Sequence, residues 1–155
     1  MPTEIELRCE TIEECYEFTL SYAARGLSTS EDSDLGRQVR HHLTRAVTAM
    51  ADLKACCAAA IDKEGLAPRE KYEDFFAVLT RDAQSSIAAI ELVLAQPVIS
   101  SQLIDNLNAC IHLRALLTDL FLITEILQLR QAQTEAMASG VRRHSSSNRV
   151  GSHRI

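Results

Sequence analysis

Residues 39–60 read VRHHLTRAVTAMADLKACCAAA. Apolar and small side chains recur here in alternating steps of four and three residues, which places them along one face of an α-helix. Neither Gly nor Pro interrupts the stretch, and its Ala, Leu and Lys residues favour helix. So narrow a stripe is typical of a helix in a bundle. The predicted buried row is Val39, Leu43, Ala46, Met50, Leu53, Cys57 and Ala60.

Turn-forming and capping residues mark both ends of this second helix. Gly65 follows the stripe and Pro68 comes three residues later, the usual order of Gly past one helix end and Pro at the next start. Before the stripe, the polar segment 27–34 (LSTSEDSD) holds Ser28 and Glu31 at capping-box spacing. We therefore expect the second helix to follow this segment and to end before Gly65.

The N-terminal residues fit two structures. In residues 2–10 apolar and charged side chains alternate as in a strand, yet the apolar positions also continue onward with helical spacing. Thr11 followed by Glu14 forms another capping box, which favours a helix start at that point. We expect a helix over Thr11–Ala24, ended by Gly26, and leave residues 2–10 open between strand and helix.

Two more helices are expected after Pro68. Pro97 ends the first of them, and Ser100 is a suitable N-cap for the second, which should run to Met137. The third helix repeats the spacing of the second. Its predicted core row is Tyr72, Phe76, Leu79, Ala83, Ser86, Ile90 and Val93.

The fourth predicted helix has more apolar surface than a bundle helix needs. From Ile111 to Leu129, 12 of 19 residues are apolar, and they surround most of the circumference. A bundle helix normally keeps one face in water, so the excess needs a second partner. The simplest partner is another copy of the chain; the alternative is a central position within one chain. The expected self-contact uses Leu113, Leu117, Leu120, Phe121 and Ile123.

These patterns predict an all-α protein with a single domain. Connections of about four to nine residues imply antiparallel neighbours, hence an up-down-up-down four-helix bundle over residues 1–138. Residues 139–155 (SGVRRHSSSNRVGSHRI) are rich in Ser, Arg and Gly and lack a hydrophobic period. Their composition predicts a disordered basic tail.

Charge and cysteine content limit the function classes. The net charge is −5, but the tail holds four Arg and no acid, so residues 1–138 carry 12 basic and 21 acidic side chains. An acidic body is not typical of a general nucleic-acid binder. The five Cys show no repeated spacing, and there is no secretion signal and no apolar run of about 18 residues. We expect a cytoplasmic protein with reduced thiols and no membrane contact.

A cluster of cations, here called the basic ridge, overlaps the start of the second helix. It lies largely away from the apolar stripe and can bind an acidic protein or the phosphates of RNA or DNA. The alternative is a solvated face that pairs with the acidic first helix. The ridge comprises Arg37, Arg40, His41 and Arg45, and Arg142 and Arg143 of the tail join it as candidate partner-binding residues.

Metal chemistry has little support in the sequence. No His has a Glu three residues before it, which excludes the pattern of di-iron carboxylate bundles. Cys56 and Cys57 point about 100° apart on a helix, and Cys110 and His112 also lie on different faces. We predict no metal and no cofactor, with a metal-binding bundle as one alternative.

The enzymatic alternative rests on Arg37 and His42. Their Arg-x4-His spacing is similar to the short motif of HEPN-type helical ribonucleases. That similarity implies charge stabilisation by the Arg and proton transfer by the His. No phosphate-binding loop, Ser/His/Asp set or Cys nucleophile motif is present, so a non-catalytic protein is the leading prediction.

Three short motifs resemble two groups of bacterial four-helix bundle proteins: the 23S rRNA intervening-sequence proteins and the accessory bundle proteins of diversity-generating retroelements. Residues 35–41 (LGRQVRH) resemble their helix-2 start, Leu-x-x-Gln-(Ile/Val)-Arg-Arg. Residues 75–92, with FFAVL, SS and IEL, resemble their third helix. Residues 98–101 (VISS) resemble their Tyr-Ile-Ser-Glu element before helix 4.

The resemblance implies an up-down bundle that assembles into a ring-like homopentamer without enzymatic activity. In the retroelement branch it further implies binding to a reverse transcriptase and to nucleic acid, with Arg37, Arg40 and His41 matching the basic element. The sequence therefore predicts a non-catalytic accessory or scaffold protein. It should form homo-oligomers and bind a protein or nucleic-acid partner through the basic ridge.

Overall fold

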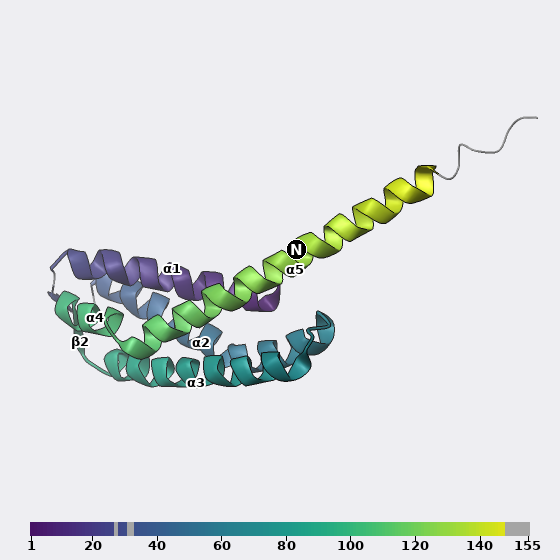
Figure 1. Cartoon of the computed structure of the whole chain (residues 1–155). Coiled ribbons are helices and arrows are strands. Elements are labelled where there is room, and N and C mark those ends of the chain that lie inside the picture. Colours follow the sequence, from purple (N-terminus) through teal and green to yellow (C-terminus); the bar gives the residue numbers. More distant parts are fainter. Residues whose placement is uncertain (27, 31–32, 148–155) are drawn as a thin grey trace, which may run out of the picture. The chain divides into compact units, whose positions relative to one another are not determined.

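The structure is a computed structural model that describes residues 1–26, 28–30 and 33–147. Within these residues the chain is almost entirely helical, which confirms the all-α class (Figure 1). Five helices and one pair of three-residue strands follow each other along the described chain. They are α1 (Glu4–Ala24), β1 (Ser28–Ser30), α2 (Asp34–Lys63), α3 (Arg69–Leu94), β2 (Val98–Ser100), α4 (Ser101–Asn108) and α5 (Ile111–Ser147).

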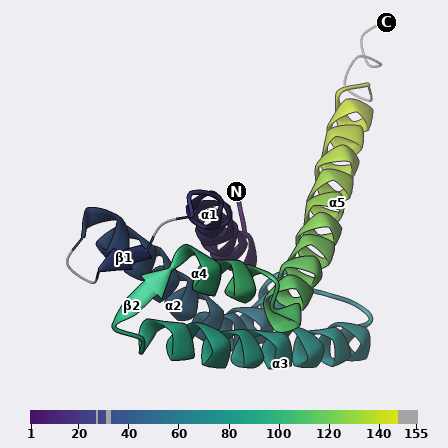
Figure 2. The ribbon, with the colours of Figure 1, turned by 90° about the vertical axis from the view of Figure 1, so that its left-hand side faces the viewer.

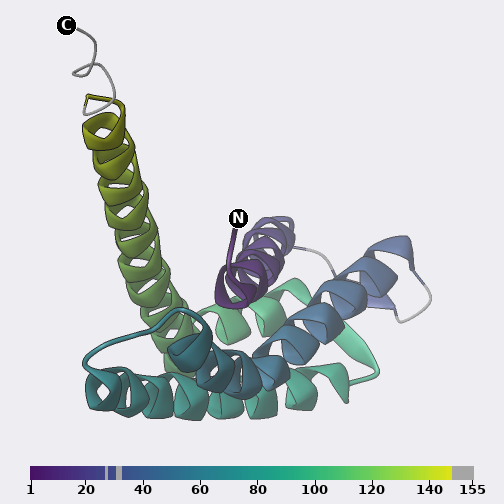
Figure 3. The same ribbon diagram turned by 90° about the vertical axis from the view of Figure 1, so that its right-hand side faces the viewer.

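The apolar stripe of α2 holds the first part of the chain together. α2 packs against both α1 and α3 (Figure 3). All seven positions of the predicted stripe are buried, so this prediction is confirmed. Full burial of an aliphatic side chain contributes roughly 2 kcal/mol, so the row supplies much of the cohesion between these three helices.

The core face of α3 also agrees with its predicted spacing. Six of the seven predicted positions are buried, and Tyr72 at the start of the row is half-buried. Ser86 is a polar member of this row, and its hydroxyl donates a hydrogen bond to the backbone carbonyl of Asp82 at 2.8 Å. Pro68 stands at the N-cap of α3, and the helix ends before Pro97 as expected.

Of the two structures left open for residues 2–10, the helix is the one observed, and α1 begins at Glu4, seven residues before Thr11. Thr3 is the N-cap of α1: its hydroxyl accepts from the Glu6 N–H at 3.2 Å, and its own N–H donates to the Glu6 carboxylate at 2.6 Å. Ile5 and Cys9 are buried on the same face of α1 as the later core positions. The helical spacing of the apolar residues, and not their strand-like alternation, therefore describes this segment. The Thr11 hydroxyl instead donates to the Leu7 carbonyl.

Glycines follow the ends of α1 and α2. Gly26 and Gly65 have φ angles of +65° and +59°, a left-handed conformation that a side chain bearing a Cβ adopts only with strain. Ser33 is the N-cap of α2, and its hydroxyl accepts a backbone N–H three residues later at 2.9 Å. Of the expected capping pair Ser28 and Glu31, Glu31 lies outside the described residues.

A short antiparallel strand pair joins two connections far apart in the sequence (Figure 2). In β1 and β2, Thr29 pairs with Ile99. The Tyr22 hydroxyl at the end of α1 donates to the Ile99 carbonyl at 2.5 Å, and the Ser101 hydroxyl donates to the Tyr22 carbonyl at 3.1 Å. These bonds attach the end of α1 to the start of α4.

The predicted fourth helix is divided into two helices. Ser100 caps α4 as expected, accepting the Leu103 N–H at 3.1 Å, but α4 ends after eight residues and α5 begins at Ile111. Neither Gly nor Pro marks the break. Asn108 lies at this break and is 6% exposed. Neither the nitrogen nor the oxygen of its side-chain amide has a hydrogen-bond partner within the described chain.

Helix α5 continues into the segment expected to be a disordered tail. The helix runs to Ser147, so residues 139–147 are helical, and residues 148–155 lie outside the described part. The segment before Gly140 contains good helix formers, and one glycine costs a helix only about 1 kcal/mol. The chain divides into two units, Met1–Phe121 and Leu122–Ile155.

The capping box at Thr3 gives a direct test of where α1 begins. Thr3→Ala should lower the free energy of unfolding by about 1 kcal/mol, because it removes one partner of the reciprocal pair. Thr11→Ala is the matched control and should change it by less than about 0.5 kcal/mol. Urea denaturation measures both, and equal losses would contradict the start at Glu4.

Candidate functional site

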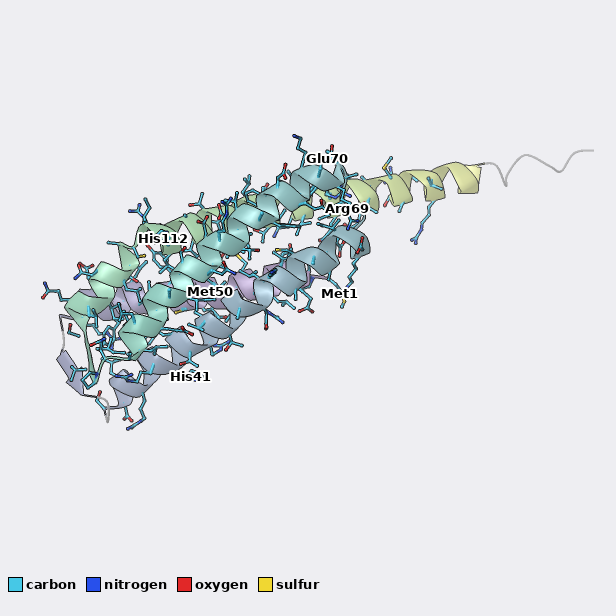
Figure 4. The ribbon with its side chains drawn as sticks, turned by 90° about the horizontal axis from the view of Figure 1, so that it is seen from below. Met1, His41, Met50, Arg69, Glu70 and His112 are labelled. Carbon is cyan, nitrogen blue, oxygen red and sulfur yellow. The ribbon has the colours of Figure 1, made fainter. Side chains whose placement is uncertain are left out.

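α2 positions the four side chains of the basic ridge, which have different surroundings. Arg37, His41 and Arg45 are exposed, whereas Arg40 is half-buried. Figure 4 shows that His41 on α2 lies far from Arg69, the first residue of α3.

Arg40 stabilises the end of α3. Its two terminal nitrogens donate to the carbonyl oxygens of Leu94 at 2.9 Å and Gln96 at 2.6 Å. Those carbonyls belong to the last turn of α3 and its connection, where the helix dipole favours a cation. Two of the five donors of this guanidinium are therefore used within the fold, so Arg40 has less capacity to bind a partner than its sequence position suggested.

The other two arginines of the ridge form exposed ion pairs. Arg37 pairs with Asp34 one turn earlier, and Arg45 lies 3.6 Å from the Glu14 carboxylate of α1. The pair of Arg45 with Glu14 is the kind of contact expected from the alternative in which the basic ridge is a solvated face that pairs with the acidic first helix. Exposed pairs of this kind are typically worth less than about 1 kcal/mol, so an acidic partner could replace either acid.

A surface groove beside the ridge contains cations that already have acidic partners. The groove has a volume of about 420 Å³ and lies between α1 and α2, with Arg8, His41 and Arg45 in its lining. Arg8 approaches Asp52 at 3.5 Å and Glu4 at 3.3 Å. Because both arginines of this groove, Arg8 and Arg45, already pair with acids, the groove is not a strong site for an anion.

The residues of the ribonuclease alternative do not converge. His42 stacks on Phe18, with ring centroids 4.2 Å apart. Burial of the imidazole lowers the pKa of His42, and the neighbouring His41 and Arg45 lower it further. Arg37 and His42 are five positions apart on one helix, which places them roughly 140° apart around its axis. This geometry does not favour joint action on one phosphate.

The buried thiols are held in the protonated form. Burial is the main cause that raises the pKa of Cys9, Cys15 and Cys57 to about 12. A thiolate is the form that attacks substrates and binds metals, so these three are poor candidates for either role. Among the residues described, no group of three or more His, Cys, Asp or Glu side chains is arranged to hold a metal ion.

A pair of acids between α3 and α5 was not found from the sequence. Asp119 is hydrogen-bonded to Asp82, and its pKa is raised to about 7 by burial first and then by that bond and the charge of Asp82. One oxygen of Asp119 is buried without a hydrogen-bond partner in the described chain. The two residues are 37 positions apart, so no local pattern indicated their contact.

Most of the predicted self-association residues are buried within the chain. Leu113, Leu117, Leu120 and Ile123 are buried, and of the five only Phe121 is exposed. In this respect the structure agrees with the alternative that this helix is largely covered within one chain.

A different set of α5 residues remains exposed. The exposed fractions are 74% for Ile111, 52% for Leu122 and 54% for Leu129. The interval of seven residues places Leu122 and Leu129 near one line along the helix. We call the side of α5 that carries Leu122 and Leu129 the outer face of α5.

The two arginines of the predicted tail are exposed near the end of α5. Arg142 and Arg143 follow a segment in which every side chain from residue 132 onward is exposed. Cations are favourable in the last turns of a helix because they complement the helix dipole.

The comparisons with known proteins leave the function open. No protein family, curated protein or solved structure compared with this chain matches it. No described helix combines the length and the apolar character that crossing a bilayer requires.

The cap formed by Arg40 predicts an asymmetry within the basic ridge. Arg40→Ala should lower the free energy of unfolding by about 2 kcal/mol, because it removes two charge-assisted hydrogen bonds to carbonyls. Arg45→Ala removes an equal charge from an exposed pair and should cost less than about 1 kcal/mol. Thermal and urea unfolding compare the two, and an equal loss would contradict the structural role of Arg40.

The acid pair predicts a pH-dependent stability. The folded pKa of Asp119, about 7, exceeds its ordinary value of 3.8, so the pair destabilises the fold increasingly as pH rises from about 4 to about 7. Asp119→Asn should therefore stabilise the protein at pH 8 and have little effect at pH 4. The gain should be roughly 1 kcal/mol, because partial solvent exposure reduces it.

The matched control for this pH effect is Asp74→Asn. Asp74 is an exposed acid on α3, and its replacement should change stability by less than about 0.5 kcal/mol at either pH. Unfolding curves at pH 4 and pH 8 decide the question. A benefit of Asp119→Asn that is the same at both pH values would show that the acid pair is not its source.

Proposed function

We propose that this chain is a non-catalytic accessory or scaffold protein that works as a homo-oligomer. Its fold is interpreted as an up-down-up-down four-helix bundle in which α4 and the start of α5 take the place of the fourth helix. The observation that carries the proposal is the outer face of α5, which is apolar and exposed in the single chain.

The outer face is distinct from the buried face of the same helix. Leu113, Leu116 and Leu120 recur at helical spacing and are buried, whereas Leu122 and Leu129 are about half exposed. A helix that is apolar on two sides needs a partner on each side. The chain supplies one partner, and a second copy is the simplest source of the other.

The later part of α5 supports the same proposal. Residues 132–143 form helix although all their side chains are exposed, and Met137 and Val141 are among them. An isolated helix of such length is marginal in water, because its backbone order is not supported by packing. Contact with a second copy would supply that packing.

The proposed partner of the assembly is acidic, either a protein or a nucleic acid. Arg37, His41 and Arg45 remain exposed on α2, and Arg142 and Arg143 add charge on α5. The resemblance to the bacterial bundle proteins supports a ring of five copies and a reverse transcriptase with its nucleic acid as the partner. The ribonuclease and metal-binding alternatives gain no comparable support from the positions of their residues.

Replacing the leucines of the outer face tests the self-association. In sedimentation equilibrium the native chain should show the mass of two or more copies of the 17.2 kDa chain. The double variant Leu122→Glu/Leu129→Glu should sediment as a folded monomer, because charge there opposes burial.

The matched control is Gln128→Glu/Thr134→Glu. It adds the same charge to exposed positions on the same stretch of α5, away from the outer face, and should keep the native mass. If the native chain itself is monomeric at tens of micromolar, the proposal is wrong.

A further inference from the structure

A second groove lies between α2 and α3, apart from the basic ridge. Its volume is about 500 Å³, and its lining includes Cys57, Ile61 and Phe76 as an apolar floor. Ala58 and Ala77 are exposed at its sides, and such small residues allow a helix to approach closely.

The cations that line this groove differ in whether an acid neutralises them. Arg69, labelled in Figure 4, forms ion pairs with Asp62 at 2.7 Å and Glu73 at 2.8 Å. Lys54 of α2 and Arg81 of α3 also line the groove, and both are exposed. Neither forms an ion pair within the described residues.

This pattern specifies the chemistry of an occupant. An apolar floor beside two cations without acidic partners fits an amphipathic helix that carries apolar side chains and a carboxylate on one face. A carboxylate placed between Lys54 and Arg81 would be attracted by both charges. The open shape of the groove suits a helix lying along it better than an enclosed small molecule.

The outer face of α5 has this arrangement. Leu122, Glu125 and Leu129 recur at intervals of three and four residues, so they share one side of the helix. All three are exposed, and Glu125 has no ion pair among the described side chains. We infer that the groove between α2 and α3 binds the outer face of α5 from a second copy of this chain.

In this contact Leu122 and Leu129 cover the apolar floor, and Glu125 lies between Lys54 and Arg81. The inference rests on the self-association proposed above and adds the surface that receives α5. Such a contact is heterologous, because the two copies use different surfaces. In a pair of copies, one copy has an unoccupied groove and the other has an uncovered outer face. Further copies can therefore add until the ends join in a ring, or a filament forms if they do not.

Charge reversal on each side tests the pairing. Glu125→Arg alone and Lys54→Glu/Arg81→Glu alone should each weaken self-association about tenfold, because like charges then meet in the contact. The triple variant restores opposite charges in every contact, and its association should return to within about threefold of the native constant. Sedimentation equilibrium measures the constants, and circular dichroism checks each fold.

Glu135→Arg is the matched control, since it makes the same change at an exposed position of α5 outside the proposed contact. It should leave the association constant unchanged. If the charge variants associate like the native chain while Leu122→Glu/Leu129→Glu does not, the groove assignment is overturned and the self-association stands. Failure of the triple variant to recover would also overturn the pairing, and a monomeric native chain would overturn both proposals.

Discussion

α5 carries apolar side chains on two sides, and one chain buries only one of them. The row that includes Leu116 and Leu120 is fully enclosed, so it fixes the start of α5 within the first unit. The outer face keeps Leu122 and Leu129 about half exposed. Because exposed apolar side chains are stabilised by a partner that covers them, this face is the basis of the proposed function in assembly. The proposed scaffold role and the proposed groove contact both depend on it.

The charges of α2 serve the fold before they serve a partner. Arg40 caps α3 and Arg45 approaches an acid of α1, so part of the basic ridge belongs to the contacts between helices. Two exposed cations that form no ion pair among the described side chains, Lys54 and Arg81, lie instead beside an apolar groove. Charge density along the sequence is therefore a poor guide to available charge, because helices with complementary charges neutralise one another when they pack.

Sequence patterns anticipated features that depend on one helix and missed those that depend on two. The stripe of α2 was predictable because its spacing needs no knowledge of the neighbouring helices. The contact of Asp82 with Asp119 was not, since it joins residues on separate helices. The break after Asn108 lacks the Gly or Pro that usually marks a helix end. The sequence predicts Leu113 and Leu117 at a self-contact, whereas both are buried in the single chain, because apolar periodicity cannot distinguish burial within a chain from burial between chains.

Amide hydrogen exchange along α5 at two protein concentrations is the most direct test of the central claim that a second copy covers the outer face. If the claim holds, amides of residues 122–141 exchange slowly, and their protection increases with protein concentration because assembly stabilises the helix. The contrary result is rapid exchange of residues 122–141 at every concentration while α2 stays protected. That outcome would show that α5 has no covering partner.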